Sequence, residues 1–119
     1  MNRAILLFLL GFSTQAQAQE ETAQASGALL RGLDKVSGQT TDITLKSGER
    51  AQLGTLNIAL NECRYPAGNP AGDAFAGLDI REPGREAPVF QGWMIASTPA
   101  LSAMDHARYD IWVIRCTTS

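Results

Sequence analysis

Three residues of the types used in nucleophilic catalysis are spaced four apart near the end of the sequence. Ser102, His106 and Asp110 supply a hydroxyl, an imidazole and a carboxylate, the groups of a serine hydrolase. On one helix Ser102 and His106 would share a face. Asp110 instead falls in an apolar run typical of a strand, and the sequence has no G-x-S-x-G elbow. We therefore assign no catalytic residue, and a small hydrolase ranks third among the functions considered.

The same segment offers one imidazole flanked by carboxylates, a donor set that could hold a metal ion. Asp105, His106 and Asp110 match no established ligand spacing, and His106 is the only histidine in the sequence. At the end of a helix an imidazole has another use, because it can cap the last carbonyls there. We predict no metal site and no cofactor.

Four residues of this segment are candidates for a binding surface. Trp93, Tyr109 and Trp112 combine a broad apolar face with a polar group, which suits a sugar ring or a protein partner, and His106 lies close to them in the sequence. The competing expectation is that the tryptophans fill the core. The apolar neighbours of Trp112 favour the core for that residue, whereas Gly92 leaves Trp93 free to face either way.

The first residues are typical of a secretory signal peptide. Arg3 precedes an apolar run over residues 4–12, and an A-x-A pattern allows cleavage after Ala16 or Ala18. The run is shorter than the roughly 20 residues that a membrane span needs, so we expect no span after cleavage. We predict a signal peptide over residues 1–18, a flexible leader over residues 19–27 and a single β-rich domain over residues 28–119.

Export would place the two cysteines in an oxidising compartment. We therefore predict a disulfide between Cys63 and Cys116, with two free thiols as the alternative. The alternation of the preceding strand gives Cys63 the parity of Asn57, not that of Leu60. A bridge in the core would need a β-bulge near Glu62, and a bridge without one would lie on an outer face.

The sequence after the leader has mostly a period of two, which predicts strands. The expected strands cover residues 28–36, 40–46, 49–53, 56–61, 75–82, 89–95 and 109–116. Ser47 and Gly48 are predicted to form a two-residue hairpin turn. The longest loop, residues 65–73, is either a recognition loop or a plain connection.

One short helix fits the pattern. Thr98 is a suitable N-cap, Pro99 suits the first helical position, and residues 100–106 would follow with Leu101 and Met104 facing the core. The expected fold class is mainly β, a small antiparallel β-sandwich or barrel with one short helix.

Charge limits the partners that the chain can bind. The sequence has 10 basic and 12 acidic residues, which are interspersed, and its net charge is −2. Nucleic acids and anionic lipids attract clustered lysine and arginine, so we predict no nucleic-acid partner and no charged attachment to a membrane.

Four segments carry a resemblance to a known family: LRGLDKVSGQTTD, GTLNIALNECR, IREP and FQGWMIASTPALSAMDHARYDIWVIRC. They are similar to a group of small exported alphaproteobacterial proteins known only as a domain of unknown function. The similarity runs from about Leu29 to Cys116, and the last segment is the most specific, with Ala107 where members often have proline. The resemblance implies no activity, ligand or catalytic residue. Genes of the family lie near a gene for an accessory subunit of respiratory NADH dehydrogenase, which is an association and not a mechanism.

These observations favour an exported, non-catalytic interaction domain of the periplasm. We expect it to act as an accessory or assembly factor for an envelope or inner-membrane complex, with an envelope protein as its partner. The alternative is a module that binds a cell-envelope glycan. A glycan site would expose Trp93 beside polar side chains, a protein site would show an apolar patch or an open strand edge, and an enzyme would bring Ser102 within about 3 Å of His106.

Overall fold

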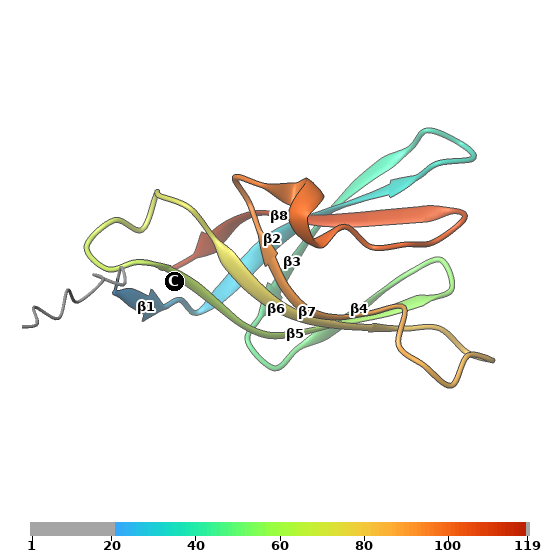
Figure 1. Cartoon of the computed structure of the whole chain (residues 1–119), viewed down its shortest axis with the longest axis horizontal. Coiled ribbons are helices and arrows are strands. Elements are labelled where there is room, and N and C mark those ends of the chain that lie inside the picture. Colours follow the sequence, from blue (N-terminus) through green and yellow to red (C-terminus); the bar gives the residue numbers. More distant parts are fainter. Residues whose placement is uncertain (1–20, 119) are drawn as a thin grey trace, which may run out of the picture.

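Two antiparallel sheets enclose one core in the computed structural model, which describes residues 21–118 (Figure 1). The five-stranded sheet contains β1 (Thr22–Gln24), β4 (Arg50–Leu53), β5 (Leu56–Pro66), β6 (Phe75–Arg81) and β7 (Phe90–Ile95). The three-stranded sheet contains β2 (Gly27–Asp34), β3 (Thr40–Lys46) and β8 (Tyr109–Thr117). The mainly β prediction is confirmed, and the arrangement is sandwich-like.

The order of the strands leaves open edges in both sheets within the described chain. The larger sheet runs β1-β5-β6-β7, with β4 also paired to β5, and the smaller runs β3-β2-β8. Strand β2 is therefore central, and its partner β8 is the last strand of the chain. No helix among residues 21–118 has the length and apolar character needed to cross a membrane.

The ordered sheet begins earlier than the sequence predicts. Strand β1 pairs with the far end of β5, where Thr22 lies opposite Pro66 and Gln24 lies opposite Arg64. The Arg64 side chain also donates to the Thr22 hydroxyl at 2.9 Å. The predicted flexible leader over residues 19–27 is wrong from Thr22 onward, because backbone pairing at a sheet edge needs no large apolar side chain. The predicted signal peptide over residues 1–18 lies outside the described residues.

The turn at Ser47 and Gly48 does not make the predicted hairpin. The turn is tight, since the Glu49 amide donates to the Lys46 carbonyl at 2.9 Å, but β3 pairs with β2 and β4 pairs with β5. The chain therefore changes sheets at this turn. The local sequence determines that the chain turns here, whereas the burial of apolar side chains determines which strands β3 and β4 pair with.

The alternating strand predicted at residues 56–61 is the centre of the larger sheet. Leu56, Ile58 and Leu60 are fully buried, whereas Asn57 and Asn61 are exposed. The opposite wall of the core comes mainly from β2 and β8. The largest fully buried side chains are Leu30, Leu56, Ile58, Leu60, Leu78, Ile80, Ile111, Val113 and Cys63.

The predicted disulfide between Cys63 and Cys116 is confirmed, with Cα atoms 5.7 Å apart. The β5–β6 register shifts between Leu60 and Glu62, which makes Asn61 the extra residue of a bulge and turns Cys63 into the core. This bulge is the one that the parity of Cys63 requires. The bridge joins the two sheets.

A second bulge lies on β8, also two residues before the cysteine. Leu29 lies opposite Arg115 and Leu30 lies opposite Val113, so Ile114 is the extra residue. The shift puts Cys116 on the same face as the buried Val113. Trp112 therefore does not share the face of Cys116, and the expectation that Trp112 fills the core is wrong, because it is half-buried on the outer side of β8.

The predicted helix is shorter and less buried than expected. Residues Pro99–Ser102 form the 3-10 helix η1, with Pro99 at its start and no side-chain cap from Thr98. Met104 packs into the core, but Leu101 is 75% exposed. A single turn cannot bring both residues to one face, so Met104 reaches the core from the segment after η1.

Candidate functional site

His106 is held by both of its ring nitrogens. Nδ1 accepts the backbone amides of Arg108 at 3.0 Å and Tyr109 at 3.1 Å, while Nε2 lies 3.1 Å from Glu82 Oε1. A nitrogen that accepts two N–H groups carries no proton, so the neutral ring has its proton on Nε2, facing the carboxylate. The imidazole therefore stabilises the backbone conformation just before β8 and links this segment to Glu82, the residue that follows β6.

This bonding leaves the predicted hydrolase arrangement unformed. No hydrogen bond joins Ser102 to His106 in the described chain, and Ser102 lies in η1 while Asp110 lies in β8. Within residues 21–118 no group of three histidine, cysteine, aspartate or glutamate side chains is close enough to hold a metal ion, so Asp105, His106 and Asp110 do not converge.

Glu82 is the partner that links His106 to the β4–β5 turn. Its carboxylate accepts the Thr55 hydroxyl as well as the His106 ring. These hydrogen bonds hold the pKa of Glu82 below its ordinary value, and the bond from Thr55 has a larger effect than the bond from His106. Glu82 is separated from His106 by 24 residues, so nothing in the local sequence pattern predicts this pair.

Arg108, two residues after His106, forms an ion pair with Asp34 at the end of β2. The Arg108 guanidinium donates to both carboxylate oxygens of Asp34, at 3.1 and 2.9 Å. The Asp34 carboxylate also accepts hydrogen bonds from the backbone amides of Val36 and Ser37. The hydrogen bond from Arg108, together with those from the two amides, lowers the pKa of Asp34 well below its ordinary value. The Lys35 amide donates to the Arg108 carbonyl at 2.7 Å. The cluster therefore ties β8 to its neighbour β2.

Tyr109 is buried and is removed from the candidate binding surface. Its ring packs against the β4–β5 turn, where a Cβ added to Gly54 would overlap the Tyr109 hydroxyl. The ring also lies 5.5 Å from the His106 ring and 5.4 Å from the Arg108 guanidinium carbon, measured to its centroid. Tyr109 is the packed centre of this end of β8.

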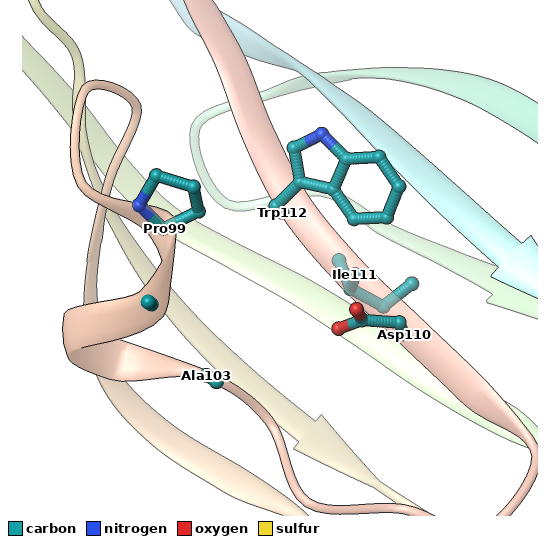
Figure 2. A pocket seen from close by; sticks show the side chains of 6 residues that line it. Pro99, Ala103, Asp110, Ile111 and Trp112 are labelled. Carbon is teal, nitrogen blue, oxygen red and sulfur yellow. The ribbon is translucent and has the colours of Figure 1, made fainter.

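Trp112 lines a cleft between η1 and β8. The cleft has a volume of about 300 Å³, and its walls are formed by Pro99, Ala100, Ala103, Asp110, Ile111 and Trp112. Figure 2 shows the η1 residues on one side and the β8 residues on the other. The small side chains of η1 leave this space open. Strand β8 is also an edge of its sheet within the described chain.

Trp93 is 45% exposed on the outer face of the larger sheet. It lies opposite Gly77 on β6, and two atoms of its six-membered ring would be 3.5 Å from a Cβ placed there. The indole therefore covers the glycine, and Gly77 is buried although it faces outward. Of the four predicted binding residues, the structure places Trp93 and Trp112 at separate surfaces and assigns His106 and Tyr109 to holding the fold together.

The fold and its sites define a small, disulfide-linked β-sandwich domain with an apolar cleft at one strand edge and an exposed tryptophan on one sheet face. The chain belongs to the family described as an uncharacterised protein conserved in bacteria (DUF2155), whose model matches residues 28–116. It is 32% identical over 87 residues to the uncharacterised protein RP359 of Rickettsia prowazekii. That match covers 71% of this chain and 56% of the relative, so the chain spans about half the length of the relative it matches. No solved structure matches the chain.

Proposed function

We propose that this protein is an exported, non-catalytic interaction domain that serves as an accessory or assembly factor for a complex of the bacterial envelope or inner membrane. The observation that carries the proposal is the apolar cleft between η1 and the edge strand β8. Edge strands and apolar clefts are the features by which small β-domains receive a segment of another protein.

The shape of the cleft favours an extended segment of a partner protein with small apolar side chains. Ala100 of η1 and Ala103, directly after η1, form one wall, and Trp112 gives the opposite wall a broad apolar face. Leu101 is 75% exposed on η1, next to this wall, and adds apolar surface. Together they supply the desolvated centre that a protein contact needs.

His106, the only imidazole of the sequence, already has structural partners, which also supports a binding role. Both ring nitrogens of His106 are occupied, and Asp34 and Glu82 hold Arg108 and Thr55. The disulfide is consistent with export, because such bonds persist in oxidising compartments.

Photo-crosslinking in intact cells tests this proposal. A photoreactive amino acid replaces Ala100 in the cleft, and the matched control replaces Val36, which is 75% exposed at the β2–β3 turn. We expect a discrete adduct with one envelope protein from position 100, lost in the Ala103→Glu variant, and no such adduct from position 36. The same adducts from both positions, or adducts unchanged by Ala103→Glu, would contradict the proposal.

A further inference from the structure

The outer face of the larger sheet carries a second surface, separate from the cleft. We propose that this face binds a glycan, with one sugar ring stacking on the exposed face of the Trp93 indole. The inference goes beyond the proposed protein-binding role and rests on different residues. The glycan class is a polymer of β-linked pyranoses with equatorial hydroxyl or acetamido groups, which present a flat C–H face to an aromatic ring.

The first observation is that the Trp93 ring packs against Gly77 and remains partly exposed to solvent. Met94 points into the core, so the alternation of β7 places Trp93 on the outer face. One side of the ring rests on Gly77 and comes near the Asn61 Cβ, which lies 3.7 Å from the Cβ position of that glycine. With 45% of the residue exposed, the other side is available to solvent. A ring held in this way loses little freedom when a ligand stacks on it.

The second observation is that hydrogen-bonding side chains surround the indole. The next row across the sheet places Asp79 opposite Gln91, and the Gln91 amide donates to Asp79 at 2.9 Å. Arg81 donates to the same carboxylate at 2.8 Å. Across Gly77 from Trp93, on β5, Asn61 is exposed at the bulge. Such groups, already aligned by their neighbours, match the alternating donors and acceptors of a sugar.

The third observation is the balance of charge on this face. Arg81 pairs with Asp79, and Arg64 pairs with Glu62 at 3.0 Å, so these acidic groups are paired, and Arg50 on β4 adds an exposed positive charge near Asp79. A polyanion requires clustered positive charge, and an apolar peptide requires a surface without partly exposed ions. A glycan of low charge is compatible with this mixture of polar pairs and one aromatic platform.

A titration with a soluble tetrasaccharide of β-1,4-linked N-acetylglucosamine, monitored by NMR of the protein, tests the inference. We expect saturable shifts that include the Trp93 indole N–H and the Gln91 side-chain amide. Trp93→Ala should weaken binding about tenfold, which is about 1.4 kcal/mol, and Trp93→Phe should weaken it less, because an aromatic ring remains for the sugar to stack on. Trp112→Ala is the matched control and should leave the affinity unchanged.

Three outcomes of the titration would overturn the inference. They are no saturation by the tetrasaccharide or by solubilised peptidoglycan fragments, equal affinity in Trp93→Ala and the unsubstituted protein, and loss of binding in Trp112→Ala alone. An unfolding midpoint measured for each variant separates loss of the platform from loss of the fold. If Trp93→Ala instead removes the adduct formed from position 100, the face belongs to the protein interface and the glycan inference fails.

Discussion

The two ends of β8 are fastened by different chemistry. At its far end Cys116 is bonded covalently to Cys63 in the other sheet. At its near end the Tyr109 ring packs against the β4–β5 turn, while His106 and Arg108, just before β8, hydrogen-bond to Glu82 and to Asp34 of β2. The covalent end depends on one bond and on two bulges that aim the cysteines. The polar end depends on several weak contacts whose partners are far apart in the sequence.

Because the two ends are held by different interactions, substitutions at each end should reduce the stability of the domain in different ways. A disulfide restricts the unfolded chain, so its loss acts on the whole domain at once. The polar end is made of separable contacts, so each substitution should remove one part and leave the rest.

Replacing both cysteines should have the largest effect. The Cys63→Ala, Cys116→Ala double variant removes a cross-link that spans 53 residues, and we expect a loss of about 4 kcal/mol in the free energy of unfolding. Urea unfolding followed by tryptophan fluorescence measures this loss. A change below about 1 kcal/mol would mean that the polar end alone holds β8 in place.

Gly54→Ala should be the most damaging single change at the polar end. Its φ is +57°, and the new Cβ would overlap the Tyr109 hydroxyl, so we expect a loss of about 3 kcal/mol. Gly48→Ala is the matched control, because Gly48 also has a positive φ, +90°, but has nothing within 4 Å of the new Cβ. The control should lose only about 1 kcal/mol. Equal losses in thermal or urea unfolding would show that Tyr109 packing contributes little.

His106→Ala should cost about 2 kcal/mol, because it leaves two backbone amides without their acceptor. His106→Asn restores an acceptor near the Nδ1 position, whereas His106→Gln restores a donor near the Nε2 position. We expect Asn to recover more stability than Gln in urea unfolding. The reverse order would place the main contribution at the Glu82 contact.

Acid should weaken the polar end before it affects the covalent end. The pKa values of Asp34 and Glu82 are lowered in the folded protein, so their contribution is present above their unfolded values, near pH 4, and is lost as the pH falls through the folded values. We expect the urea midpoint to fall below about pH 4. Asp34→Asn should have a lower midpoint at pH 7 and a shallower decline with acid, and parallel curves would contradict this assignment.

Much of the fold follows from the alternation of apolar residues. Leu56, Ile58 and Leu60 mark a half-buried strand, and the opposite parity of Cys63 correctly requires a bulge beside it. On β8 the same reasoning fails, because Ile111, Trp112, Val113 and Ile114 are all apolar, so this run does not show which of its faces is buried. The bulge at Ile114 is visible only when β2 is in place.

The sites were less accessible to sequence reasoning than the strands. Trp93 and Trp112 could be named as candidates, but the exposure of Trp93 depends on Gly77, which becomes its neighbour only through the β6–β7 register. The role of His106 depends in the same way on Glu82. Residue type identifies such side chains, and long-range pairing decides whether they bind a partner or hold the fold together.

The position of β2 has a consequence for the timing of folding. Its two neighbours are β3, which follows at once, and β8, whose last residue is Thr117. A chain that emerges from its amino terminus, whether from a ribosome or an export channel, can form the β2–β3 hairpin early. It cannot close the smaller sheet until β8 has emerged, and five other strands separate β8 from β2 in the chain. Until that moment one side of β2 has no partner, and the newly made chain must be protected from pairing with its own copies.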